Sequence, residues 1–123
     1  MSKGIYSPTY FRNNPEECDV PAVLYCVVLV NKETLVRECI KIGITKGSSY
    51  KSVNKRAKGF TGYDLRVQKI VKGRLEDIYY LEEYLHEKWS DYKYNGASKF
   101  GGWTELFTAD VLKDILASIP SEI

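Results

Sequence analysis

The chain has 123 residues, of which 44% are hydrophobic and 28% are charged, and this suits one globular domain with no room for a second. Its 18 basic and 16 acidic residues give a net charge of only +2, so a nucleic-acid partner would have to be bound by a local basic patch. No apolar run approaches the ~20 residues of a membrane span, and the first residues do not resemble a signal peptide. We therefore expect a cytoplasmic protein with no membrane partner.

The chain contains three cysteines, Cys18, Cys26 and Cys39. They lack the C-x-x-C pairs that usually anchor a zinc site, and two of them lie in strand-like sequence. We therefore expect reduced thiols. A zinc site built from these cysteines and His86 is the weaker alternative.

Residues 1–20 differ from the rest of the chain. They contain two prolines and two adjacent asparagines, which interrupt every periodic pattern. We predict an irregular N-terminal arm ahead of a domain formed by residues 21–123. The aromatic side chains of Tyr6, Tyr10 and Phe11 are the candidates for holding this arm against the domain.

Two strands joined by a short turn are predicted next. Residues 22–30 are apolar at both the odd-numbered and the even-numbered positions, which indicates a strand buried on both faces. Residues 31–34 are polar and suit a hairpin loop, and residues 35–45 form the partner strand. In the second half of that strand isoleucines alternate with Lys41 and Gly43, so these two residues face away from the isoleucine side.

A short helix is predicted over residues 50–58, stopped by Gly59. Arg56 falls beside its apolar stripe. The opposite side of this helix carries three lysines, Lys51, Lys55 and Lys58. The third strand is predicted over residues 65–72. The side chains of that strand that alternate toward the core are Leu65, Val67 and either Ile70 or Val71.

The longest helix is predicted over residues 74–92, and one of its acidic residues lies in an unusual place. Glu82 follows Ile78 by four positions and precedes Leu85 by three, so it sits on or at the margin of the buried face, whereas Glu83 turns toward solvent. A carboxylate there is costly to bury unless it is paired, hydrogen-bonded or bound to a metal. Glu82 is therefore the most informative acid of the chain.

An extended segment at residues 103–107 and an amphipathic helix that begins after Thr108 close the chain. The predicted order is β-β-α-β-α followed by a C-terminal helix. We therefore predict an α+β fold, in which a small three-stranded antiparallel or mixed sheet is flanked by helices.

This order, together with Tyr25, the Lys41-Ile42-Gly43 triplet, Arg56 and Glu82, resembles the GIY-YIG endonuclease superfamily. The similarity is greatest to the small branch that is common in phage genomes and among meiotically up-regulated eukaryotic proteins, where the second motif often has the sequence KIG. The resemblance covers residues 22–107. The literal Gly4-Ile5-Tyr6 triplet lies outside it, because Ser7 and Pro8 follow and break a strand.

The resemblance implies a catalytic role for four residues. Tyr25 would be the general base or a relay to it, or else a packed strand tyrosine. Lys41 replaces the second tyrosine of the family, so either it contacts phosphate as a point charge or activity is weakened. Arg56 would grip the scissile phosphate, with a surface arginine as the alternative. Glu82 would hold a single Mg²⁺ or Mn²⁺, with a structural ion pair as the alternative.

Further residues are implied more weakly. Gly43 would let the substrate approach the strand, or would mark a bulge. His86 would carry a proton, or would be a hydrogen-bonded structural histidine. The residues expected to contact nucleic acid beside Gly43 are Lys46, Lys51, Lys55, Lys58 and Asn95, and a solvated helix face is the alternative for the lysines.

The sequence thus predicts a metal-dependent hydrolase of nucleic-acid phosphodiesters, with DNA the favoured substrate and a homodimer or larger nuclease assembly left open. If the chain is phage-encoded, it would act in the host cytoplasm. One alternative is a weak or inactive GIY-YIG-like fold that binds nucleic acid or nucleotide, or inhibits a partner. Another is a partner-binding domain whose ten tyrosines form an interaction surface.

Overall fold

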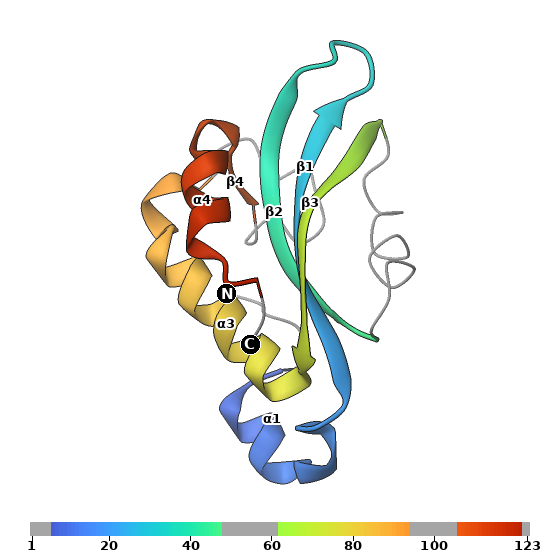
Figure 1. Ribbon diagram of the computed structural model, residues 1–123, viewed down its shortest axis with the longest axis vertical. Helices are drawn as coiled ribbons and strands as arrows, with labels where there is room; N and C mark the ends of the chain where they lie inside the picture. Colours follow the sequence, from blue (N-terminus) through green and yellow to red (C-terminus); the bar gives the residue numbers. More distant parts are fainter. Residues whose placement is uncertain (1–5, 48–61, 94–105, 122–123) are drawn as a thin grey trace.

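The computed structural model describes residues 6–47, 62–93 and 106–121. Within these residues the fold is α+β, as predicted, and contains a four-stranded antiparallel sheet in the order β3-β1-β2-β4 (Figure 1). The strands are β1 (Pro21–Asn31), β2 (Arg37–Lys46), β3 (Tyr63–Arg74) and β4 (Leu106–Thr108). The prediction of three strands is therefore one strand short. The segment of β4 was expected to be extended but not to pair.

The central strand β1 is buried on both faces, which confirms the prediction for residues 22–30. We call the two sides of the sheet the helix face and the opposite face. The helix face carries Ala22, Leu24, Cys26, Val28 and Val30 of β1, which pack with apolar residues of the helices. The opposite face carries Val23, Tyr25, Val27 and Leu29, which pack with Cys39 and Leu106.

The long helix α3 (Leu75–Lys88) lies against the helix face, where its Leu75, Ile78 and Leu85 are fully buried. It ends four residues earlier than predicted and is followed by a single 3₁₀ turn, η2 (Ser90–Tyr92). The last elements are η5 (Ala109–Val111) and α4 (Leu112–Ser118). None of the described helices is long and apolar enough to cross a membrane.

The turn between β1 and β2 protrudes from the body of the protein (Figure 1). The side-chain oxygen of Asn31 accepts hydrogen bonds from the backbone N–H groups of Glu33 and Thr34, so this polar residue organises the loop. Leu35 has a positive φ of 60°, which a strand does not allow. This is why β2 begins at Arg37 and not, as predicted, at residue 35.

The N-terminal arm is not irregular, in contrast to the prediction, since it forms the helix α1 (Pro8–Asn13) and the turn η1 (Pro15–Glu17). The side chain of Ser7 accepts a hydrogen bond from the backbone N–H of Tyr10 at 3.0 Å, and Pro8 occupies the first helical position. Both are favourable at a helix start. Pro8 and Pro15 were predicted to interrupt the periodic pattern. They instead occupy the first positions of these two elements.

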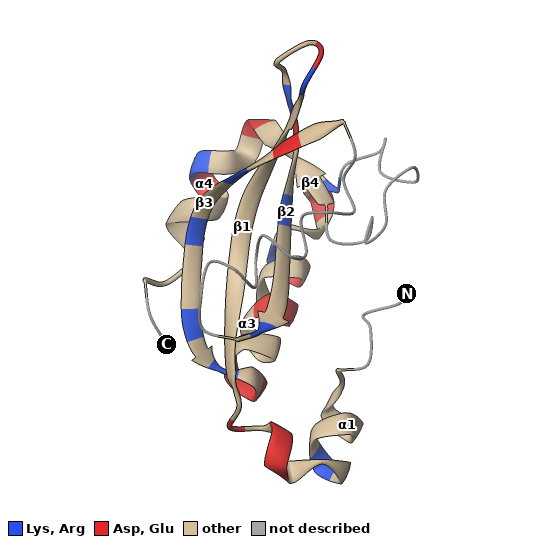
Figure 2. Cartoon of the chain, turned by 90° about the vertical axis from the view of Figure 1, so that its right-hand side faces the viewer, with Lys and Arg blue, Asp and Glu red and all other residues tan. Residues whose placement is uncertain are grey.

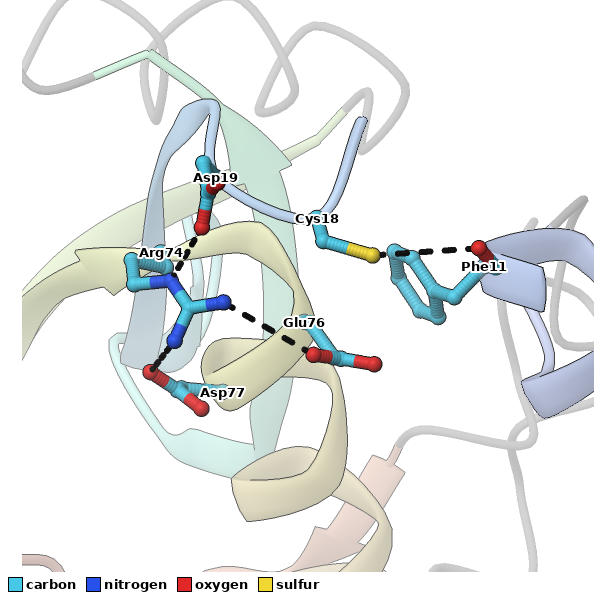
Figure 3. A network of polar contacts seen from close by, with 6 residues as sticks. All are labelled: Phe11, Cys18, Asp19, Arg74, Glu76 and Asp77. Atoms are coloured by element: carbon cyan, nitrogen blue, oxygen red, sulfur yellow. Dashed lines mark hydrogen bonds and ion pairs between the residues drawn. The ribbon is translucent and has the colours of Figure 1, made fainter. Parts of the chain in front are cut away.

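The arm is joined to the start of α3 by polar contacts. The first two N–H groups of α3, those of Leu75 and Glu76, donate to the carbonyl oxygens of Val20 and Cys18 at 2.8 and 3.2 Å. Arg74 lies among three carboxylates, with Nε 2.7 Å from Asp19 and its other nitrogens 3.8 and 3.5 Å from Glu76 and Asp77 (Figure 3). The arm therefore satisfies backbone groups that a helix start leaves open.

Candidate functional site

Tyr25 and Gly43 are paired directly across strands β1 and β2. The phenol ring of Tyr25 crosses β2 at this point, because a β-carbon placed on Gly43 would lie 2.6 Å from the hydroxyl oxygen and 2.7 Å from Cζ. Only a glycine leaves room for the ring. The β1–β2 register shift lies elsewhere, between Leu29 and Val30, so the alternative that Gly43 marks a bulge is wrong.

Lys41 lies on the same face of β2 as Gly43, as the alternation predicted. Its side chain is only 7% exposed, and its Nζ lies 5.8 Å from the centre of the Tyr25 ring. A lysine ammonium at this distance from an aromatic ring is attracted to its face. Tyr25 and Lys41 thus form one pair of predicted site residues on the opposite face of the sheet.

Glu82 and His86 form a second pair, one turn apart on α3. Their side chains are 3% and 4% exposed, so the predicted burial of Glu82 is confirmed. His86 Nε2 lies 3.0 Å from the carbonyl oxygen of Ile42 and 3.9 Å from Glu82 Oε2. Because a carbonyl oxygen only accepts, Nε2 carries a hydrogen and donates it to Ile42. The ring of His86 also packs edge-on against Phe107 at 5.5 Å.

The two pairs therefore approach the same short stretch of β2, residues 41–43, from its two faces. Tyr25 and Lys41 belong to the opposite face, whereas α3 packs on the helix face. The described pairing of β4 with β2 covers Cys39 to Lys41. The structure brings these predicted residues to one strand segment, but it does not gather all their side chains in a single cluster.

Lys46 has a different environment from the one predicted. Its ammonium donates to the carboxylate of Glu17 in the N-terminal arm, and the Tyr10 hydroxyl donates to the same oxygen at 3.0 Å. These two hydrogen bonds hold the pKa of Glu17 below its ordinary value, and the bond to Glu17 raises the pKa of Lys46. The ammonium of Lys46 therefore forms an ion pair with Glu17 of the same chain.

The remaining predicted site residues lie outside the described parts of the chain. These are Arg56, Lys51, Lys55, Lys58 and Asn95. Their roles stay predictions.

The donor set for a divalent cation is small. Within residues 6–47, 62–93 and 106–121, no three His, Cys, Asp or Glu side chains gather to hold a metal ion. Mg²⁺ keeps several water ligands and often takes only one or two carboxylates, so Glu82 suits such an ion as its one protein carboxylate. The three cysteines are free, as expected, and burial raises the pKa of Cys26 to about 12.

Two groups that contact predicted site residues could not be identified from the sequence. The carbonyl of Ile42 and the carboxylate of Glu17 both contact predicted site residues. Neither gives a sequence signal, because each contact joins segments about 30 to 45 positions apart. Only the folded sheet brings them together.

Comparisons with protein-family models, with curated proteins and with solved structures found no match to this chain.

Proposed function

We propose that this protein is a divalent-metal-dependent nuclease that hydrolyses phosphodiesters of DNA at residues 41–43 of β2. One observation supports this above others. Among the described residues, the buried polar or charged side chains are Lys41, Glu82 and His86. All three were predicted from the sequence as site residues. Lys41 belongs to this strand segment, His86 lies 3.0 Å from the carbonyl oxygen of Ile42, and Glu82 lies 3.9 Å from His86. Burial of ionisable groups is costly, and such groups concentrate at functional sites.

The absence of a side chain at Gly43, which leaves room for the Tyr25 ring to cross the backbone of β2, supports this position for the scissile phosphate. At that point the hydroxyl of Tyr25 lies over the backbone of β2, and His86 is anchored to the neighbouring carbonyl of Ile42. A phosphate beside this strand segment would be approached from both faces of the sheet. This is how the two pairs would act on one substrate.

In this proposal a water molecule attacks phosphorus in line with the departing 3′ oxygen. Tyr25 accepts the proton of that water or relays it, and Lys41 and Arg56 hold the charge that develops on the phosphate oxygens. Glu82 would hold Mg²⁺ or Mn²⁺, and the bound ion would supply charge stabilisation at the leaving oxygen. His86 lies beside this carboxylate, with Nε2 3.9 Å from Oε2, while its Nε2–H donates to the carbonyl oxygen of Ile42.

A second function is favoured by a different observation. Tyr25 and Lys41 lie on the opposite face from Glu82 and His86, and none of the four is more than 7% exposed. Side chains buried on two sides of a sheet suit structural roles. The second candidate is therefore a non-catalytic domain that binds nucleic acid or nucleotide, or inhibits a partner.

A cleavage assay separates the two functions. Supercoiled plasmid, linear DNA and RNA are incubated with the protein in Mg²⁺ or Mn²⁺, and the parent is compared with Glu82→Ala and Arg56→Ala. Loss of cutting in both variants supports the nuclease. Cutting that survives both substitutions would exclude the proposed site, and folded protein that never cuts would favour the binding domain.

A further inference from the structure

Strand β3 contains one extra residue relative to β1. Lys69 is paired with Cys26 and Val67 with Val27, so Gln68 has no partner position and forms a β-bulge. The side-chain amide of Gln68 donates to the carbonyl oxygen of Arg66 at 3.1 Å. Bulges of this kind re-aim side chains and are common at sheet edges and beside functional sites.

The bulge places the side chains of two basic residues, Arg66 and Lys69, on the same face of the sheet. Arg66 and Lys69 are three positions apart, so in a regular strand they would point to opposite faces. In this strand Arg66 is opposite Val28 and Lys69 is opposite Cys26, and these two residues of β1 share the helix face. Arg66 and Lys69 therefore lie side by side, separated by about two strand residues, or ~7 Å. Successive phosphates of a nucleic-acid strand have a similar separation.

The two side chains are available to different degrees. Arg66 is exposed and makes no ion pair with any described residue. The ammonium of Lys69 is half-buried and donates to the carbonyl oxygen of Ile119 at 2.6 Å, which orients it and leaves two of its hydrogens for other acceptors. One cation is thus fixed and the other reaches into solvent.

Charge is segregated on the described surface although the net charge of the chain is small. Strand β3 carries Arg66, Lys69 and Lys72 against a single acid, Asp64, while Arg74 at its end is paired with carboxylates; Figure 2 shows basic residues along the strand. Helix α3 has the reverse composition: besides the buried Glu82, its acids Glu76, Asp77, Glu83 and Glu87 outnumber its single lysine. The β3 edge is therefore the side of the described structure that complements a polyanion.

We propose that the bulged edge of β3, with Arg66 and Lys69, is a docking site for the phosphate backbone of the nucleic acid. This rests on the proposed function, because it names a surface along which the same substrate lies. The site contributes affinity and orientation but no base recognition. None of its residues was selected from the sequence, since only the bulge places them together.

A different explanation exists for cations on an edge strand. Lysines there discourage pairing with the edge of another sheet. That explanation requires charge at the edge, but it does not require Arg66 and Lys69 to share a face or to affect nucleic-acid binding. It predicts that neutral variants self-associate.

The test measures binding of fluorescently labelled duplex DNA by anisotropy in EDTA over a series of salt concentrations. The double variant Arg66→Gln/Lys69→Gln should bind about tenfold more weakly at low salt, and the slope of log K against log salt should fall by about two. Arg66→Lys/Lys69→Arg, which keeps both charges, should retain the parent slope. Lys88→Gln and Lys113→Gln on the helices remove exposed charges elsewhere and should change the slope little.

The outcomes separate this site from the proposed function. An unchanged slope in a folded double variant would overturn the docking site while cleavage by the parent still stood, and self-association of that variant would then assign the cations to edge protection. A reduced slope in a protein that never cuts would support the docking site and overturn the nuclease. If the parent does not bind duplex or single-stranded DNA at all, the docking site is wrong.

Discussion

The phenol ring of Tyr25 and the backbone of Gly43 occupy adjoining strands so closely that a β-carbon on Gly43 would lie 2.6 Å from the tyrosine hydroxyl. The ring is fully buried, so it has little room to move. The tyrosine and the glycine are therefore one structural unit. This unit fixes where the hydroxyl lies over β2.

Gly43→Ala should destabilise the protein by about 1–3 kcal/mol, because it overpacks a buried site. The free energy of unfolding is measured in urea for Gly43→Ala, Tyr25→Ala and the double variant. Since removal of the ring also removes the clash, the double variant should be less destabilised than the sum of the single ones. Additive effects would show that the ring does not lie over Gly43.

Phe11→Ala should destabilise the whole domain by about 3–5 kcal/mol, the usual cost of removing a buried aromatic ring. Phe11 is only 3% exposed, and its ring packs against Tyr79 of α3 at 5.5 Å. The measurement is the urea midpoint followed by far-UV circular dichroism. The neighbouring Arg12→Ala, which changes an exposed side chain, serves as control. A loss below about 1 kcal/mol would mean that the arm is not part of the folded unit.

Acid should weaken the contact between the arm and β2. The hydrogen bonds from Lys46 and Tyr10 hold the folded-state pKa of Glu17 below its ordinary value. A lowered folded-state pKa gives stability that is present above the pKa of the unfolded chain and is lost as the pH falls through the folded-state pKa. Glu17→Gln should therefore lower Tm at pH 7, and the difference from the parent should shrink toward pH 3. A difference that stays constant over this range would contradict the ion pair.

Much of the fold could be predicted because its signals are local. The apolar run of residues 22–30 and the apolar stripe of residues 74–92 identify a two-sided strand and an amphipathic helix without knowledge of their partners. Helix α1 was also within reach, since Ser7 and Pro8 form a recognisable helix start. Prolines interrupt a periodic pattern inside a helix but are favourable at its first position, where Pro8 and Pro15 lie.

Other features depend on contacts between distant segments. The three residues of β4 form a strand only because β2 pairs with them. The extra residue Gln68 shifts the alternation of β3, which places Leu65, Val67 and Ile70 on the opposite face and Val71 on the helix face. No period in the sequence marks such a bulge. The sequence therefore left open whether Ile70 or Val71 shares the face of Leu65 and Val67, and the bulge places Ile70 there.

In the candidate site, too, some features follow from local sequence patterns and others depend on contacts between distant segments. The burial of Glu82 followed from its place on the helical stripe, and the orientation of Lys41 followed from strand alternation. Which face of the sheet receives α3 is set by packing of the whole domain. The separation of Tyr25 and Lys41 from Glu82 and His86 could therefore not be predicted from either pattern alone.

The proposed site is tested most directly by the single-turnover rate of plasmid cleavage by Glu82→Gln beside Glu87→Gln. Both variants neutralise a carboxylate of α3, but Glu82 is only 3% exposed whereas Glu87 is exposed. We expect Glu82→Gln to cut at least about a hundredfold more slowly, because charge stabilisation of the transition state is lost, and Glu87→Gln to match the parent. Equal rates for the two folded variants would contradict a catalytic role for Glu82 and with it the proposed site.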